Sequence, residues 1–211
     1  MKYVSGFYLP DSDTYFADIL TEKGFQIERL IEALKYVDNF RLAIDGGAHV
    51  GTWSKFMASQ FNEVYSFEPC IETYECLNRN VSLCDNVHTF NVALGKKESK
   101  GNVCIDKSRI GNTGSNYIEL DDNGSTIIKT IDDYDFRYID FIKLDLEGME
   151  YEALQGAEKN LKNHKPVIMI ECKGNIPRVK NDEHKKALEY LKSLGYKVVD
   201  VFGKDFVLRS K

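Results

Sequence analysis

Strand-like and helix-like segments alternate along most of this chain, and this alternation is the feature that most constrains its fold. The strand-like runs are RLAIDGG, EVYSFEP, VHTFNVAL, IDFIKLDLEG and PVIMIEC, and the helix-like segments are TWSKFMASQF, IETYECLNRNV, MEYEALQGAEKNL and DEHKKALEYLKSLGY. Strands that alternate with helices form parallel neighbours joined by right-handed crossovers. The sequence therefore predicts an α/β fold with a Rossmann-like, doubly wound, mostly parallel sheet.

Two segments depart from the alternation. The stretch GNVCIDKSRIGNTGSNYIELDDNGSTIIKTI has turn signals between β-rich runs, which predicts a β-rich insertion between the third and fourth strands. The final KVVDVFGKDFVLRS predicts an antiparallel hairpin with Gly203 in its turn. We expect a single domain overall, in which residues 41–211 form the main body and residues 1–40 form a strap and helix packed on it.

Apolar residues at helical spacing predict which side of each helix faces the core. The expected inward residues are Ile27, Leu30, Ile31 and Leu34 in the first helix, Ile71, Tyr74, Leu77 and Val81 after the second strand, and Ala187, Leu188, Leu191 and Leu194 in the last helix.

Charge and cysteine content exclude several classes of protein. The formal net charge is −5, and the Lys and Arg residues are scattered, so we expect no stable nucleic-acid binding. The five cysteines form no CxxC pair and indicate reduced thiols rather than a disulfide framework or a zinc cluster. No apolar run approaches the roughly 20 residues that span a bilayer, so we expect a cytoplasmic protein. The sequence does not indicate an oligomeric state.

The stretch AIDGGAHVGTWS places a glycine turn between the first strand and the next helix. Asp45 ends the strand, while Gly47 and Gly51 permit a tight turn beside a helix N-terminus that suits a carboxylate or a phosphate. Glu68 ends the next strand, where a carboxylate can accept hydrogen bonds from a ribose diol. Together these residues indicate a ligand that contains adenosine, although a glycine turn also occurs for packing alone and Glu68 has the alternative of a solvated strand-end charge.

The spacing of the glycines separates two classes of cofactor. A dinucleotide site has the pattern G-x-G-x-x-G, whereas this loop has D-G-G-A-H-V-G, which favours a ligand without a pyrophosphate. S-Adenosylmethionine fits this pattern, and Asp45 would meet its cationic amino end directly or through water.

Four blocks of the sequence resemble the FkbM-type methyltransferases, a branch of the class I S-adenosylmethionine-dependent enzymes. They are AIDGGAHVG, VYSFEP, FNVALG and IDFIKLDLEGMEYEALQGA, and PVIMIEC resembles the next strand of that family. The resemblance implies the class I methyltransferase fold, and O-methylation in natural-product, sugar or glycan contexts. It also implies cofactor contacts for the residues Asp45, Gly47, His49, Gly51 and Glu68, with Val92 and Ala93 beside the adenine. His49 stands where the family leads us to expect asparagine.

The end of the fourth strand supplies the expected catalytic group. For an alcohol acceptor the enzyme must align the hydroxyl and accept its proton. In KLDLEG we expect Asp145 to face the acceptor, with Glu147 as second choice and Glu171 in the same cleft. The alternative for Asp145 and Glu147 is capping of the following helix. Asp145 and Glu171 could also hold Mg²⁺, but nothing in the spacing demands a metal, and we predict none.

The acceptor side is the least legible part of the sequence. Polar and aromatic loops outside the alternating core commonly carry specificity, which makes Tyr8, Asp11, Asn112 and Thr113 candidates to line the acceptor pocket. An N-terminal strap that only packs is an equal alternative. The predicted function is S-adenosylmethionine-dependent O-methylation of a sugar, glycan or small-molecule hydroxyl. The alternatives are a nicotinamide-dependent oxidoreductase and a non-catalytic Rossmann-like binding module.

Overall fold

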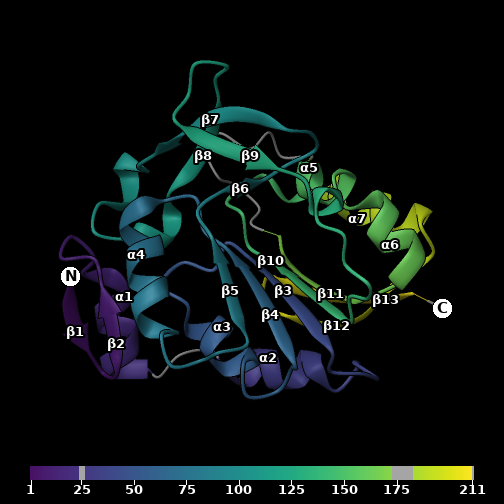
Figure 1. Ribbon diagram of the computed structural model, residues 1–211, viewed down its shortest axis with the longest axis horizontal. Coiled ribbons are helices and arrows are strands. Elements are labelled where there is room, and N and C mark those ends of the chain that lie inside the picture. Colours follow the sequence, from purple (N-terminus) through teal and green to yellow (C-terminus); the bar gives the residue numbers. More distant parts are fainter. Residues whose placement is uncertain (24–26, 173–182, 211) are drawn as a thin grey trace.

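A computed structural model describes residues 1–23, 27–172 and 183–210, and a seven-stranded sheet forms its centre (Figure 1). The strand order is β12-β13-β11-β10-β3-β4-β5. These strands are β3 (Leu42–Gly46), β4 (Glu63–Phe67), β5 (Val87–Phe90), β10 (Phe141–Leu144), β11 (Val167–Glu171), β12 (Tyr196–Phe202) and β13 (Asp205–Ser210). Every neighbouring pair is parallel except the two pairs that β13 makes with β11 and β12. This order confirms the predicted doubly wound sheet with its antiparallel terminal hairpin.

Helices cover both faces of the sheet, which explains the near-continuous apolar runs of the strands. Ala43 and Phe141 pack into the apolar cluster on one face, and the next residues, Ile44 and Ile142, pack into the cluster on the other. The first face is covered by α2 (Ile27–Leu34) and α3 (Thr52–Met57), and the second by α5 (Glu150–Gln155), α6 (Glu158–His164) and α7 (Glu183–Ser193). The period-two alternation of side chains along each strand produces these two cores.

A second, smaller sheet forms the predicted insertion and lies at the top of Figure 1. It has the order β6-β9-β7-β8, with β6 at Ala93–Leu94, β7 at Ser99–Cys104, β8 at Tyr117–Leu120 and β9 at Thr126–Lys129. Two short 3-10 helices lie between β7 and β8, namely η2 (Lys107–Arg109) and η3 (Thr113–Ser115). A third, η4 (Ile131–Asp133), follows β9 and leads back to the central sheet. The insertion therefore adds a small sheet above the carboxyl ends of the central strands.

The N-terminal residues form a strap against α4 (Ile71–Asn80). Strands β1 (Lys2–Val4) and β2 (Phe7–Leu9) make an antiparallel hairpin, which α1 (Tyr15–Asp18) and the π-helix η1 (Ile19–Lys23) follow. Asn80 joins this hairpin to the core, because its side chain accepts from the Tyr8 amide at 2.7 Å and donates to the Tyr8 and Val50 carbonyls.

Two predicted elements are each divided in the structure. The run VHTFNVAL is not one strand: β5 ends at Phe90, and the Asn91 side chain then donates to the Glu68 and Pro69 carbonyls, so that β6 joins the second sheet. The helix predicted over MEYEALQGAEKNL is split at Gly156, where an added Cβ would lie 2.0 Å from the Gly95 carbonyl oxygen.

Two of the predicted inward residues are on the surface. Ile31 is 44% exposed and Ile71 is 55% exposed. In α2 the fully buried Ala33 lies inward instead, and Ile71 is the first residue of α4, before the helix reaches its neighbours. The other inward residues of these helices that the structure describes are buried or partly buried.

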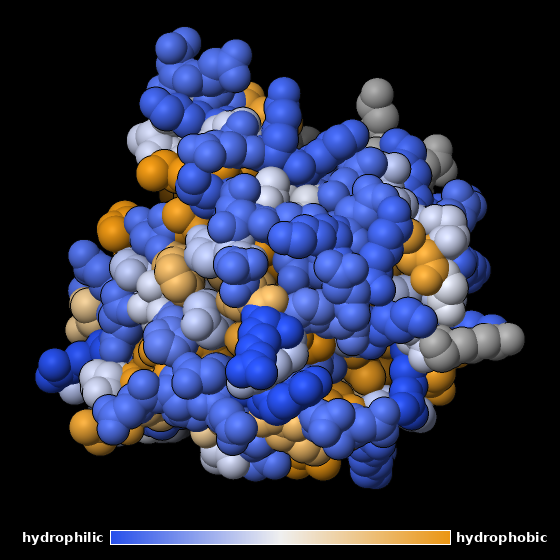
Figure 2. All heavy atoms as spheres, turned by 45° about the vertical axis from the view of Figure 1, so that its right-hand side comes forward, coloured by the Kyte–Doolittle hydropathy of each residue, from blue (hydrophilic) through white to orange (hydrophobic). Residues whose placement is uncertain are grey.

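The outer surface is mixed in character. Hydrophilic residues predominate on the face that Figure 2 presents, and hydrophobic residues are interspersed among them. In the described ranges, which omit 24–26, 173–182 and 211, no helix is long and apolar enough to cross a membrane.

Candidate functional site

A cavity of about 570 Å³ opens at the carboxyl ends of β3, β4 and β10, where the strand order reverses. This is the place at which open α/β sheets bind ligands. The second sheet and the strap complete its walls. Of the predicted site residues, the lining includes Gly47, His49, Glu68, Val92, Ala93, Asn112, Thr113, Asp145, Glu147 and Glu171. The structure thus brings most of them together around one space.

The loop between β3 and α3 holds its shape through backbone conformations that favour glycine. Gly47 has φ +74°, and an added Cβ would lie 1.9 Å from the Asp145 carbonyl oxygen. Gly51 has φ +83° and faces Leu77 of α4 rather than the cavity. His49 adopts φ +52°, a region in which asparagine, aspartate and histidine are enriched among non-glycine residues. The exchange of asparagine for histidine is therefore compatible with this backbone.

Asp45 lies behind the loop and does not line the cavity. It is fully buried, and its carboxylate accepts from Ser54 Oγ at 2.6 Å and pairs with Lys143 Nζ at 3.1 Å. Burial lowers the pKa of Lys143, but the charges of Asp45 and Asp145 outweigh this and raise it overall. The structure therefore gives Asp45 a partner inside the protein and provides no support for a direct contact with a ligand.

Lys143 connects the ends of β10 and β3. Its ammonium also donates to the Gly47 carbonyl at 2.7 Å and to the Gly46 carbonyl at 3.2 Å, and it lies 5.5 Å from the centre of the Trp53 ring. The side chain is 9% exposed and lines the cavity. Lys143 thus anchors the glycine loop to the strand that carries Asp145.

Glu68 sits at the end of β4 and faces the cavity. Its carboxylate accepts hydrogen bonds from the Cys70 amide (2.9 Å), the Thr73 hydroxyl (2.8 Å) and the His49 amide (2.8 Å). Burial raises the pKa of Glu68, although these three hydrogen bonds oppose the shift. A carboxylate has about four acceptor positions. Glu68 therefore retains room for about one further donor, on the oxygen that His49 contacts.

Three carboxylates converge on the opposite wall. Asp145, Glu147 and Glu171 each present an oxygen, and these oxygens all lie within 4.8 Å of one another. Glu147 is buried, and the other two are partly buried. These carboxylates can accept a proton from a substrate hydroxyl, or they can offer three oxygen ligands to a divalent cation.

Glu150 shapes the loop that carries two of these carboxylates. It is 5% exposed and accepts from the amides of Leu146 (2.8 Å) and Gly148 (3.1 Å). Within this loop Glu147 has φ +50°. Burial raises the pKa of Glu150 to about 7. Helix α5 begins after Met149 with no side-chain cap, so the alternative role of Asp145 and Glu147 as its N-cap is wrong.

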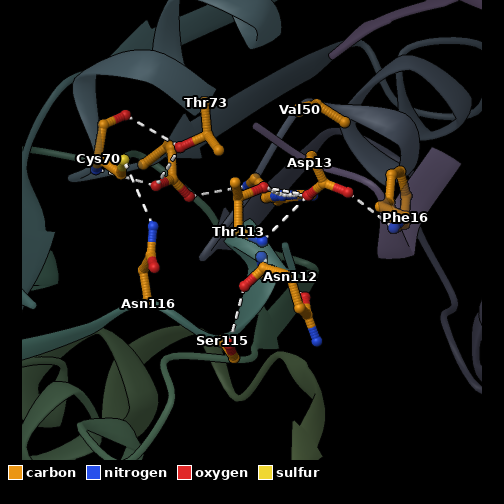
Figure 3. Close-up of polar contacts among 12 residues, drawn as sticks. Asp13, Phe16, Val50, Cys70, Thr73, Asn112, Thr113, Ser115 and Asn116 are labelled. Carbon is orange, nitrogen blue, oxygen red and sulfur yellow. Dashed lines mark hydrogen bonds and ion pairs between the residues drawn. The ribbon is translucent and has the colours of Figure 1, made fainter. Parts of the chain in front are cut away.

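The strap and the insertion meet at the edge of the cavity (Figure 3). Thr113 and Asn112 lie on the insertion side, and the fully buried Asp13 faces Thr113 from the strap. The predicted acceptor residues Tyr8 and Asp11 do not line the cavity. Tyr8 packs against Tyr3, and Asp11 is an exposed partner of the Met1 amino group.

The sequence from residue 45 to residue 198 matches the methyltransferase FkbM domain family, a match that spans more than half of the chain. The chain belongs to the FkbM family. No curated protein matches the sequence. The matched region contains β4, β5, β10 and β11 of the central sheet and the whole insertion.

Solved structures show the same fold. A methyltransferase FkbM from Methylobacillus flagellatus KT is 18% identical with a TM-score of 0.55, covering 94% of this chain and 48% of that one. The chain thus spans about half the length of that protein. A precorrin-6y C5,15-methyltransferase from Geobacter metallireducens GS-15 is 16% identical (TM-score 0.53, 98% and 97% covered). SMU.1697c from Streptococcus mutans, in complex with SAH, is 14% identical (TM-score 0.51, 87% and 96% covered). These likenesses confirm the class I methyltransferase fold.

Sequence reasoning about this FkbM-family chain missed three residues of the site. Lys143 was readable as a lysine in an otherwise apolar strand, and Glu150 as an acid three residues after Glu147. Asp13 lies two positions from Asp11 in one polar stretch, and nothing in the sequence distinguishes the buried aspartate from the exposed one.

Proposed function

We propose that the protein is an S-adenosylmethionine-dependent methyltransferase. The cavity has the size of small-molecule sites. Its residues fit the cofactor, because the Glu68 carboxylate retains a position that can accept a hydrogen bond from a ribose hydroxyl. Val92 and Ala93 would lie against the adenine of the cofactor, and Gly47 and His49 would lie against the rest of the cofactor molecule. SMU.1697c, which shares the fold, was solved in complex with SAH. When bound, S-adenosylmethionine supplies the methyl group in an activated form.

The convergence of Asp145, Glu147 and Glu171 in the same cavity carries the proposal that the acceptor is a hydroxyl. An alcohol must lose a proton as it is methylated, and a carboxylate within hydrogen-bond reach can accept it. We assign this role to Asp145 first and to Glu147 second, with Glu171 holding the acceptor. Asn112 and Thr113 would line the acceptor side. A polyhydroxylated sugar or glycan, or a small-molecule alcohol, offers the donors that three carboxylates recognise.

The same geometry supports a metal-assisted variant of this function. Oxygens that lie within 4.8 Å of one another suit Mg²⁺. Activity that EDTA abolishes and Mg²⁺ restores would favour the variant, whereas activity unchanged by EDTA would favour carboxylates acting alone.

Calorimetric titration tests the cofactor. We expect S-adenosylhomocysteine to bind and NADH not to bind. Glu68→Ala should weaken S-adenosylhomocysteine binding by about 1.5 to 3 kcal/mol, the value of a hydrogen bond to a charged group. Binding of NADH alone would favour the nicotinamide-dependent oxidoreductase, and binding of neither ligand would favour a non-catalytic module.

Transfer of a labelled methyl group tests the acceptor. Labelled S-adenosylmethionine incubated with fractionated cell extract should label a glycan or small-molecule pool. Asp145→Asn should lower the rate by about 10²-fold or more, the usual contribution of a general base. Glu189→Gln, on an exposed position of α7, serves as the matched control and should leave the rate unchanged.

A further inference from the structure

Three residues from three separate parts of the chain form a hydrogen-bonded series, which we call the His49 relay: Asp13, Thr113 and His49. Thr113 Oγ1 contacts the Asp13 carboxylate on one side and lies 2.7 Å from His49 Nε2 on the other. Asp13 of the strap lies beside Thr113, which belongs to η3 of the insertion (Figure 3), and His49 belongs to the glycine loop. The relay therefore joins the strap and the insertion to the glycine loop of the cavity.

The hydrogen bonds of the relay determine which nitrogen of the His49 ring carries the proton. The Asp13 carboxylate accepts from the Thr113 amide at 3.0 Å and from the Phe16 amide at 2.7 Å, and it also accepts the Thr113 hydroxyl proton. A hydroxyl has only one proton to donate. Thr113 Oγ1 must therefore accept from His49 Nε2, and a neutral imidazole that donates through Nε2 has an unprotonated Nδ1.

The surroundings of His49 keep the ring neutral. Burial lowers the pKa of His49 most, the charge of Asp13 opposes the shift, the charge of Lys143 adds to it and that of Asp145 opposes it, and together they place the pKa at about 4. Phe16 packs edge-on against the ring, with 4.9 Å between the ring centres. At neutral pH the ring is thus uncharged, and its orientation is set from two sides.

His49 also adjoins the proposed ribose position. Its side chain lines the cavity, and its amide donates to Glu68 at 2.8 Å. In the part of the chain that the structure describes, no group hydrogen-bonds to Nδ1. A bare Nδ1 on the ring of this lining residue can accept a hydrogen bond from a hydroxyl or ammonium group of a ligand.

We propose that Asp13 and Thr113 are positioning residues that hold His49 as its Nε2-protonated tautomer, so that Nδ1 accepts a hydrogen bond from the bound cofactor. The part of this inference that concerns the cofactor rests on the proposed function. The part that concerns the tautomer does not depend on any ligand. Through His49, the strap and the insertion determine cofactor affinity without touching the cofactor at this point.

Nitrogen-15 NMR of the ligand-free protein tests the tautomer. The shifts of the two ring nitrogens distinguish a protonated nitrogen from a bare one, and comparison with His49→Asn assigns the His49 signals among the four histidines. We expect a protonated Nε2 and a bare Nδ1 at neutral pH. A protonated Nδ1 would mean that Thr113 donates to Nε2 and would overturn the proposal.

Variants of Thr113 and Asp13 test the link to the cofactor. Thr113→Val and Asp13→Asn should alter the tautomer signal and raise the Kd for S-adenosylhomocysteine by about 3- to 10-fold, the size of one neutral hydrogen bond. Thr113→Ser keeps the hydroxyl and should restore both. Ser115→Ala is the matched control, because Ser115 donates within the same turn to Asn112 O, outside the relay.

The outcomes separate the inference from the proposed function. If the unaltered protein does not bind S-adenosylhomocysteine, the proposed function fails and the NMR result still decides the tautomer. If it binds, but Thr113→Val retains both the tautomer and the affinity, the positioning role is wrong. Equal losses in Thr113→Val, Thr113→Ser and Ser115→Ala would likewise assign the effect to packing of the turn.

Discussion

The two loops that lie side by side at the carboxyl ends of β3 and β10 each contain a non-glycine residue in the left-handed region, and different contacts hold each loop. The loop after β3 and the loop after β10 each place one non-glycine residue in the left-handed region, His49 at φ +52° and Glu147 at φ +50°. His49 is held by residues 19 and 64 positions away, Glu68 and Thr113. The Glu147 loop is held by Glu150, which contacts amides only two and four positions away. The glycine loop after β3 is thus held by residues that are distant in the sequence, whereas the amides of Leu146 and Gly148 in the loop after β10 donate to the nearby Glu150.

The largest expected effect comes from the contact between the two loops. Gly47→Ala should lower the free energy of unfolding by at least about 3 kcal/mol, because the new Cβ would overlap the Asp145 carbonyl oxygen in addition to the left-handed strain. Gly195→Ala is the control: Gly195 has φ +88°, and nothing lies within 4 Å of its added Cβ. It should cost only about 1 to 2 kcal/mol. Urea denaturation measures both, and equal losses would show that the loops do not constrain each other.

Removal of the local support is the next largest effect. Glu150→Ala leaves the buried amides of Leu146 and Gly148 without their acceptor, and it should lower the free energy of unfolding by about 1 to 3 kcal/mol. Methyl transfer should fall as well, because Asp145 and Glu147 lose their relative placement. Glu150→Gln retains one acceptor oxygen and should keep more of both. A Glu150→Ala protein with full stability would show that the hydrogen bonds to Glu150 do not support this loop.

The pH dependence of stability gives a second test of the role of Glu150 in the loop after β10. The pKa of Glu150 is raised to about 7 in the folded protein by burial, with a smaller contribution from Asp145. Its stabilising contribution should therefore be complete below its ordinary pKa near 4.5 and be lost as the pH rises through about 7. The difference in unfolding free energy between the unaltered protein and Glu150→Gln should fall by on the order of 2 kcal/mol between pH 5 and pH 8. A difference that stays constant or grows over this range would contradict the assignment.

The smallest expected change in stability is at Glu147. Replacement by glycine relieves left-handed strain of about 1 to 2 kcal/mol but adds about 0.5 to 1 kcal/mol of unfolded-state entropy. Glu147→Gly should therefore leave the free energy of unfolding within about 1 kcal/mol of the unaltered value. Methyl transfer should nevertheless drop, since one carboxylate of the cluster is lost. Thermal unfolding and the labelled-methyl assay together check this separation of stability from activity.

Periodicity predicted the central sheet because buried parallel strands and their covering helices leave strong local patterns. It failed where a distant contact decides the local structure. Phe90 ends a strand because Asn91 turns to the Glu68 and Pro69 carbonyls, and Gly156 divides a helix because the chain at Gly95 passes too close for a Cβ. Neither partner is apparent from the sequence near the break.

The site residues also divide into those that the strand pattern predicted and those whose positions depend on distant contacts. The positions of Glu68 and Asp145 at strand ends were predictable from strand order alone, because parallel strands place their carboxyl ends at one edge. The burial of Asp45 against Lys143 was not predictable, since in the sequence each of these two residues looks equally able to face a ligand. The choice of Asp13 over Asp11 depends on how the strap folds over the insertion, and that geometry involves contacts 100 positions apart.

The placement of β12 at the rim of the central sheet has a consequence for solubility. An edge strand presents unpaired backbone groups to other chains, and β12 also exposes Val198, Val199 and Val201. Its pairing with β13 shifts register between Val198 and Asp200, so a bulge interrupts the flat edge. Bulges of this kind twist an edge away from regular pairing with another molecule. The irregularity at Val199 thus interrupts the regular row of backbone groups that a strand of a second molecule would need for pairing.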